Sequence, residues 1–200
     1  LRIAYRRVMQ QVLYWLTPVM VLSAVLAEPL FRIILTEKWL PAVPYFQILC
    51  FIGLMYPIHS YNLNILKVKG RSDLYLKLEI VKKTLTVIGI FVALPFGIFA
   101  LIWTQVILNL FAFGINSVYS GRFISYSVWK QLKDIAPIFG LGILAGLGGW
   151  LIISFGSNHN HLDWVKLLLG GLAGCSVYFL ASWILQPQPV LDFRNLILKK

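Results

Sequence analysis

Two long runs without charged residues, separated by one charged stretch, constrain this chain more than any other feature. The stretch, residues 67–83, reads KVKGRSDLYLKLEIVKK and holds six Lys or Arg and two acidic residues. Residues 39–66 before it and 84–121 after it contain no Asp, Glu, Lys or Arg. A helix on the surface of a soluble protein carries polar residues on its wet face at nearly every turn. Neither run can lie in water, and we interpret residues 67–83 as a cytoplasmic loop between membrane spans.

The composition supports a bilayer as the solvent. Hydrophobic residues make up 59% of the chain and charged residues 12%, against about 25% charged in a typical soluble domain. A membrane-spanning helix needs about 20 mostly apolar residues, and the Pro/Gly signal at 94–97 divides the longest run into a helical hairpin. We therefore predict an all-α membrane helix bundle with six transmembrane helices, over residues 11–35, 42–66, 78–94, 98–119, 135–154 and 164–185.

The distribution of Lys and Arg predicts the orientation. With these spans, fifteen of the eighteen cations fall on one side and three, Arg32, Lys38 and Lys166, on the other. Cytoplasmic loops of membrane proteins are enriched in Lys and Arg, so both termini are predicted to be cytoplasmic. The chain then divides into a four-helix part (1–120), a cytoplasmic interfacial linker (121–134), two additional spans (135–185) and a cytoplasmic tail (186–200).

The best polar constellation within the spans is Gln105, Asn109 and Asn116. Their spacing of four and seven residues places all three on one face of a helix. Amides at membrane depth need hydrogen-bond partners, so this face should point into the bundle. It could form a cavity wall that binds hydroxyl-rich cargo, or it could only hydrogen-bond to neighbouring helices.

Other ionisable residues near the spans have simple structural readings. Glu28 and Arg32 are four residues apart near the predicted outer end and favour an interfacial ion pair. His59 is more typical of a hydrogen-bonded residue than of a proton-coupling one, although any ionisable residue at this depth is a candidate for function. Small residues at 142 and 146, and at 170 and 174, predict that the last two spans pack closely together.

Several classes of function find no support in the sequence. The net charge of +11 is explained by the cytoplasmic cations, and no basic stretch interleaved with aromatics suggests nucleic acid. Cys50 and Cys175 have no metal-binding spacing. His159, His161 and Asp163 could hold a metal, but a plain polar loop explains them equally well. We predict no cofactor, no metal and no catalytic site, and so no enzyme.

Two segments carry a resemblance to a known family. The runs LFRIILTEKWLPAVPYFQILCFIGL (30–54) and NLNILKVKGRSDLYLKLEIVKK (62–83) resemble bacterial polysaccharide flippases of the multidrug/oligosaccharidyl-lipid/polysaccharide exporter superfamily. The resemblance covers roughly residues 6–121 and fades over the last two spans. It includes the cytoplasmic loop residues Lys67, Lys69, Gly70, Arg71 and Asp73. Where the family has Gly before the residue preceding Lys-Trp, this chain has Thr36.

The resemblance implies the C-terminal part of a two-lobed transporter with a central cavity, multi-pass in the bacterial inner membrane. Such proteins flip lipid-diphosphate-linked oligosaccharide repeat units by alternating access, for capsule, exopolysaccharide or O-antigen synthesis. The implied partners are lipid-linked oligosaccharide, membrane lipids and a polysaccharide polymerase. Cationic residues for the diphosphate are not evident within the predicted spans, so none is assigned. The alternatives are a drug or cation antiporter of the same superfamily, which needs a carboxylate at membrane depth, and a membrane-embedded transferase of the same pathway.

Overall fold

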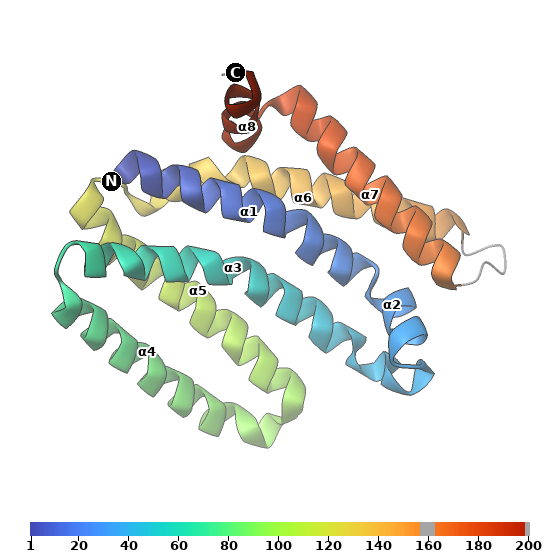
Figure 1. The fold of residues 1–200 in the computed structure, drawn as a ribbon. Helices are drawn as coiled ribbons and strands as arrows, with labels where there is room; N and C mark the ends of the chain where they lie inside the picture. The colour runs from blue at the N-terminus through green and yellow to red at the C-terminus, as the bar shows by residue number, and fades with distance from the viewer. Residues whose placement is uncertain (157–162, 199–200) are drawn as a thin grey trace. The chain divides into compact units, whose positions relative to one another are not determined.

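The protein is helical almost throughout (Figure 1). The computed structural model describes residues 1–156 and 163–198, and within these ranges it contains no strand. The prediction of an all-α fold is confirmed. The elements, in order, are α1 (Arg2–Val25), α2 (Ala27–Ile34), the 3₁₀ helix η1 (Glu37–Ala42), α3 (Val43–Val68), α4 (Ser72–Ala93), the 3₁₀ helix η2 (Leu94–Phe96), α5 (Gly97–Ile124), α6 (Val128–Gly156), α7 (Asp163–Leu185) and α8 (Gln188–Leu198).

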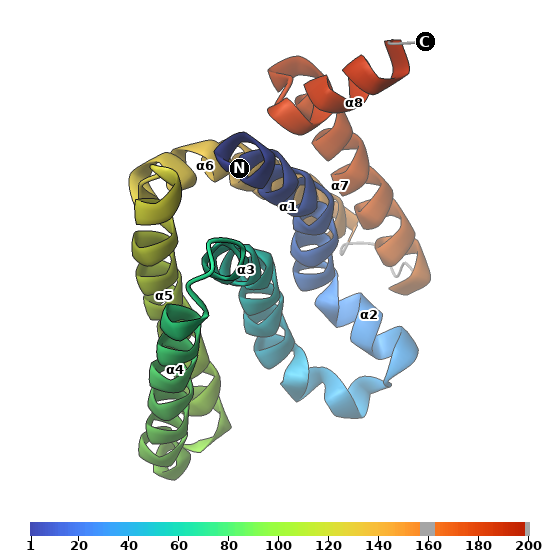
Figure 2. The same ribbon diagram turned by 60° about the vertical axis from the view of Figure 1, so that its left-hand side comes forward.

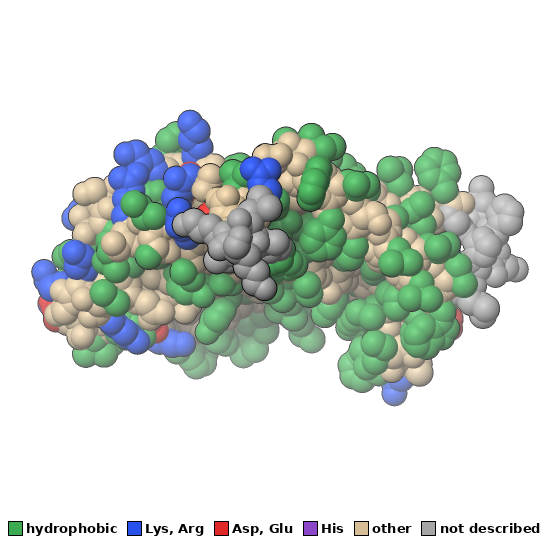
Figure 3. Space-filling model, turned by 45° about the horizontal axis from the view of Figure 1, so that its top comes forward, with side chains coloured by type: hydrophobic (Ala, Val, Ile, Leu, Met, Phe, Trp, Pro, Cys, Tyr) green, Lys and Arg blue, Asp and Glu red, His purple; other side chains and the backbone are tan. Residues whose placement is uncertain are grey.

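Within residues 1–156 and 163–198, five helical stretches are long and apolar enough to cross a membrane. They are Arg2–Val25, Glu37–Val68, Ser72–Ile124, Val128–Phe155 and Asp163–Leu185. The third is 53 residues long and contains both α4 and α5, so the count of six spans and their orientation stay predictions. Hydrophobic side chains cover most of the face shown in Figure 3, and Phe91 and Ile98 are 71% and 64% exposed. Such exposure is unfavourable in water and favourable in lipid, as in a multi-pass membrane protein.

The connection between α3 and α4 is much shorter than the predicted loop. Helix α3 continues to Val68 and α4 begins at Ser72, so most of residues 67–83 are helical. Gly70 allows the sharp turn because its φ is +70°, a conformation that side chains disfavour. The Arg71 amide donates to the Leu66 carbonyl at 2.9 Å, the bond that closes a Schellman turn after a helix. The sequence interpretation of a long loop was therefore wrong.

Three other predicted boundaries also differ from the structure. The first predicted span is two helices, since α1 ends at Val25 and α2 begins at Ala27. In the predicted linker, only residues 125–127 lie outside α5 and α6, and the predicted tail forms α8.

The described chain groups into two compact units. Unit 1 comprises Leu1–Met9 with Ile52–Asp134, and unit 2 comprises Gln10–Phe51 with Ile135–Lys200. Each unit therefore joins parts of the chain that are distant in sequence. The boundaries predicted at 120, 134 and 185 stay predictions.

In unit 1, α4 and α5 form an antiparallel hairpin, as the sequence predicts (Figures 1 and 2). Residues 94–97 make the turn: η2 contains Pro95, and Gly97 has φ +86°. The helices approach closely at Gly89, where an added Cβ would lie 2.9 Å from the methyl group of Thr104. A small residue at this position lets the two helix backbones approach closely. In a membrane, van der Waals packing of this kind stabilises helix contacts in place of the hydrophobic effect.

In unit 2, α6 and α7 pack together, as predicted, but through different glycines of α6. Gly170 and Gly174 of α7 face the backbone of α6: an added Cβ on Gly174 would lie 2.9 Å from the Ala145 carbonyl oxygen. Gly142 and Gly146 face α1 instead, with an added Cβ on Gly146 lying 2.9 Å from a Val21 methyl group. Gly142 and Gly146 therefore pack against α1. They lie on a different face of α6 from Ala145, which contacts α7.

The glycine contact predicts a difference between two alanine variants of α7. Gly174→Ala is expected to destabilise the protein by about 1–3 kcal/mol, the usual range for overpacking, because its Cβ would press on Ala145 and on the Leu22 side chain. Gly171→Ala is the matched control, since its nearest neighbour is Leu26 Cδ1 at 3.7 Å. Thermal unfolding followed by circular dichroism in detergent compares the two. Equal midpoints would contradict the assigned contact.

Candidate functional site

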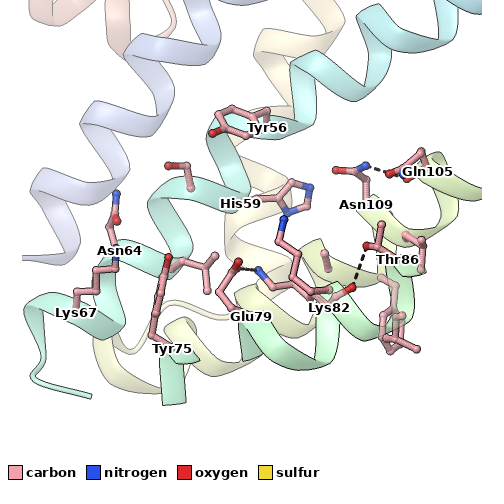
Figure 4. A pocket seen from close by; sticks show the side chains of 17 residues that line it. Tyr56, His59, Asn64, Lys67, Tyr75, Glu79, Lys82, Thr86, Gln105 and Asn109 are labelled. Carbon is pink, nitrogen blue, oxygen red and sulfur yellow. Dashed lines mark hydrogen bonds and ion pairs between the residues drawn. The ribbon is translucent and has the colours of Figure 1, made fainter. Parts of the chain in front are cut away.

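A polar cavity of about 430 Å³ lies in unit 1 between α3, α4 and α5. Figure 4 shows that side chains from all three helices point into it. Helix α3 contributes His59 and Ser60 from one turn and Asn64 from the next. Apolar helices place polar side chains at membrane depth mainly where these face a bundle interior or a water-filled space. The cavity is therefore the strongest candidate for a functional site in the described chain.

Three cations and one carboxylate are among the residues that line the cavity. Lys67 comes from the last turn of α3, while Glu79, Lys82 and Lys83 come from α4. Lys82 Nζ donates a hydrogen bond to Glu79 Oε1 within one helix (Figure 4). The Lys67 ammonium lies 4.2 Å from the centre of the Tyr75 ring, a cation–π contact. With one cation balanced by Glu79, the lining keeps a positive net charge.

The cavity is also lined by uncharged hydrogen-bonding groups. Asn109 Nδ2 donates to the Gln105 backbone carbonyl at 2.8 Å, and Thr86 Oγ1 donates to the Lys82 carbonyl at 2.9 Å. The Gln105 side-chain amide makes no hydrogen bond within residues 1–156 and 163–198. Figure 4 shows the Asn109 side chain beside His59. Both ring nitrogens of His59 are buried, and neither makes a hydrogen bond of normal geometry in the described chain. Unused donors and acceptors are thus available to a hydroxyl-rich ligand.

The structure brings together two of the three amides that the sequence grouped. Gln105 and Asn109 line the cavity, but Asn116 does not. Asn116 is fully buried, and its side-chain atoms have no hydrogen-bond partner in the part of the chain described. It lies on the same face of α5, seven residues nearer the α5–α6 connection, where α3 packs directly on α5 through a bond between Asn62 and Ser117. Asn116 is thus buried beside the contact of α3 with α5 and does not line the cavity.

Five loop residues were singled out in the sequence, and of these Lys67 alone lines the cavity; the others are Lys69, Gly70, Arg71 and Asp73. Lys69 and Gly70 form the turn itself, and both are exposed. Arg71 Nε bonds to Asp73 Oδ1 at 3.0 Å, and its guanidinium lies 5.8 Å from the Phe123 ring. These contacts fix the α3–α4 turn without reaching the cavity.

Lys82, Lys83 and Glu79 were missed as site residues because they were assigned to a loop. Helix α4 begins at Ser72, so Lys82 lies about 15 Å along its axis at a rise of 1.5 Å per residue. One signal in the sequence could have shown this: Tyr75, Glu79, Lys82 and Thr86 follow the three- and four-residue spacings of one helical face.

A second polar cluster in unit 1 is fully buried and centred on Asn62 of α3. Its Oδ1 accepts hydrogen bonds from the Tyr5 and Ser120 hydroxyls, both at 2.7 Å. Its Nδ2 donates to Ser117 Oγ at 3.0 Å and to Gln131 Oε1 at 3.3 Å. The amide thus uses both of its acceptor sites and both of its hydrogens. The cluster ties α1, α3, α5 and α6 together and leaves nothing for a ligand, so we assign it a structural role.

Next to this cluster, Asp134 joins the beginning of α1 to the beginning of α6. Arg6 Nη2 donates to Asp134 Oδ1 at 2.6 Å, and the Tyr126 hydroxyl donates to Oδ2 at 2.5 Å. Burial, and after it the bond to Asp134, raises the pKa of the Tyr126 hydroxyl well above its usual value. The hydroxyl therefore keeps its proton and remains a donor to the carboxylate.

The remaining candidates from the sequence have no site geometry in the described residues. No group of three His, Cys, Asp or Glu side chains there is placed to hold a metal ion, and His159 and His161 lie outside the described ranges. The predicted ion pair of Glu28 and Arg32 is confirmed at 3.0 Å, and Arg32 also contacts Glu37 at 2.8 Å. Glu28 is thus paired at an exposed surface.

Comparison of the chain with protein-family models, curated proteins and solved structures found no match.

Proposed function

We propose that the chain is the C-terminal portion of a transporter that flips lipid-diphosphate-linked oligosaccharide repeat units across the bacterial inner membrane, by alternating access. The observation that carries the proposal is the cavity between α3, α4 and α5, polar and positively charged within otherwise apolar helices. The sequence resemblance to polysaccharide flippases supplies the cargo class. Capsule, exopolysaccharide or O-antigen would be the product, and a polysaccharide polymerase would be the next partner.

The lining of the cavity offers two kinds of group that match the two parts of such a cargo. A diphosphate is anionic and is recognised by cations, which Lys67, Lys82 and Lys83 provide. Sugar hydroxyls both donate and accept hydrogen bonds, and the amides of Gln105 and Asn109 do the same.

A second candidate, a drug or cation antiporter of the same superfamily, is supported by Glu79. A carboxylate in a membrane cavity can exchange a proton for a cationic drug. However, Glu79 is paired with Lys82, and the cations that remain in the lining would repel a cationic cargo. The net charge therefore favours an anionic cargo.

Deletion of the chromosomal gene separates these candidates. If the chain belongs to a flippase, the deletion strain should lose surface polysaccharide and accumulate lipid-linked repeat units on the cytoplasmic face, and the intact gene should restore export. An antiporter would instead give unchanged polysaccharide and greater sensitivity to cationic drugs, with resistance lost again in Glu79→Gln. A transferase would give no complete lipid-linked repeat unit at all.

The amides of α5 allow a sharper test within the cavity. The double variant Gln105→Leu/Asn109→Leu is expected to lower export by about thirtyfold, since each of the two lost hydrogen bonds to cargo contributes roughly 1 kcal/mol. Asn116→Leu is the matched control, because it makes the same change on the same face of α5 outside the cavity. Export is measured as polysaccharide per cell at equal protein level. Full export in the double variant would show that these two amides do not bind the cargo.

A further inference from the structure

A second cavity, of about 320 Å³, lies in unit 1 where α5 joins α6. Its lining shares no residue with the cavity between α3, α4 and α5. Both charged residues in this lining are cations, Arg122 from the last turn of α5 and Lys130 from the first turn of α6. Ser125 and Ser127 add exposed hydroxyl groups between them. Two cations and two hydroxyls around one hollow are the groups that bind a phosphate.

The backbone of the connection fixes the shape of this cavity. The Tyr126 amide donates to the Gly121 carbonyl at 3.0 Å, and Ser125 has φ +53°, so the chain reverses sharply after α5. Gly121 allows this turn because a Cβ there would lie 2.5 Å from the Tyr126 carbonyl oxygen. The two cations are therefore held on either side of a well-defined turn.

The charge of the cavity is not neutralised by the protein. Neither Arg122 nor Lys130 has an acidic partner within residues 1–156 and 163–198, and the nearby Asp134 is engaged by Arg6 and Tyr126. The Arg122 guanidinium lies 5.8 Å from the centre of the Tyr119 ring, a contact that leaves its charge available. The cavity thus presents two cations that an anion from outside the chain could balance.

The surroundings of the cavity indicate where this anion comes from. Trp129 is next to Lys130 in sequence and is 76% exposed, and Val118, in the lining, is 42% exposed. Exposed Trp beside Lys or Arg is typical of the membrane–water interface, where anionic lipids attract cations. When the phosphate belongs to a lipid headgroup, the acyl chains of that lipid would contact these apolar side chains.

We propose that this cavity binds the phosphate of an anionic phospholipid headgroup, with Arg122 and Lys130 as its cationic ligands and Ser125 and Ser127 as hydroxyl donors. The site is independent of the transport cavity and of the proposed function. Binding there would fix the turn between α5 and α6 at the membrane surface.

Native mass spectrometry of the purified full chain tests the proposal. Protein in detergent is mixed with phosphatidylglycerol or with phosphatidylcholine, and the lipid retained on the chain is measured over a range of lipid concentrations. Phosphatidylglycerol should bind more tightly, and Arg122→Gln/Lys130→Gln should weaken its binding by about tenfold or more. Lys69→Gln/Lys133→Gln is the matched control, since it removes two exposed cations that line neither cavity. It should change binding less than about twofold.

Each other outcome overturns a stated part of the proposal. Equal losses in both double variants would show a general attraction to positive charge and no site. Unchanged binding in Arg122→Gln/Lys130→Gln would show that the lipid binds elsewhere. If inorganic phosphate, added alone, displaced phosphatidylglycerol at equal concentration, the lipid source would be wrong. Arg122→Lys/Lys130→Arg keeps both charges and should retain binding, which separates a lost ligand from a misfolded variant.

Discussion

Asn62→Ala is expected to destabilise the protein by about 3 kcal/mol or more, the largest effect on stability that we predict for a single substitution. Each buried group left without a partner costs about 1–3 kcal/mol. The variant removes a partner from Tyr5, Ser117, Ser120 and Gln131 together, and all four side chains are buried. Thermal unfolding in detergent, followed by circular dichroism, should show a clearly lower midpoint.

The control for this variant is on the same helix. Asn64→Ala removes an exposed amide two residues away that has no hydrogen bond in the described chain, so its midpoint should stay close to that of the unmodified protein. A similar midpoint for both variants would mean that the buried amide contributes no more than an exposed one. Asn62→Asp tests the donors separately, since it keeps the acceptor for Tyr5 and Ser120 but loses the hydrogens given to Ser117 and Gln131.

Lys67→Gln/Lys83→Gln is expected to reduce polysaccharide export by at least about tenfold, if these cations hold the diphosphate of the cargo. A hydrogen bond to a charged group contributes roughly 1.5–3 kcal/mol, so the loss of two should exceed one order of magnitude. Lys82 is left in place because it pairs with Glu79, and its removal would also strand a partly buried carboxylate. Export is measured in the deletion strain that carries each variant, at equal protein level.

Two cations of the same segment provide the control. Lys69→Gln/Lys77→Gln removes the same charge from the α3–α4 region, but these exposed residues lie outside the cavity. Export in this variant should remain close to normal, and so should its membrane orientation, which depends on the sum of nearby cations. Equal loss in both variants would attribute the effect to orientation or folding. Normal export in Lys67→Gln/Lys83→Gln would remove the cations from the proposed binding site.

The helices could be predicted from the sequence because their cause is local. Long apolar runs require helices in lipid, since every backbone group must be paired within its own segment. The α4–α5 turn was predictable for the same reason, because Pro95 and Gly97 act on their own backbone. The end of α3 was harder to locate: residues 67–83 are charged, yet Lys, Glu and Leu are strong helix formers. The charges make this segment polar, but they do not prevent most of its residues from being helical.

The cavity could be predicted only in part because it depends on which helices meet. Periodicity placed Gln105, Asn109 and Asn116 on one face of α5, but it could not show that α3 covers that face at Asn116. The Asn62 cluster had no signal of its own, since its partners come from four helices. Its members are common polar residues, and only the packing of α1, α3, α5 and α6 gives them a shared role.

Because the Asn62 side chain uses all of its hydrogen-bond donors and acceptors, few other residues can replace it during evolution. Aspartate has no hydrogens for Ser117 and Gln131, leucine has neither donor nor acceptor, and glutamine would move the amide by one methylene. A relative of this chain that changes position 62 should therefore also change the residues equivalent to Tyr5, Ser117, Ser120 and Gln131. Those five positions are expected to covary as one set across four helices.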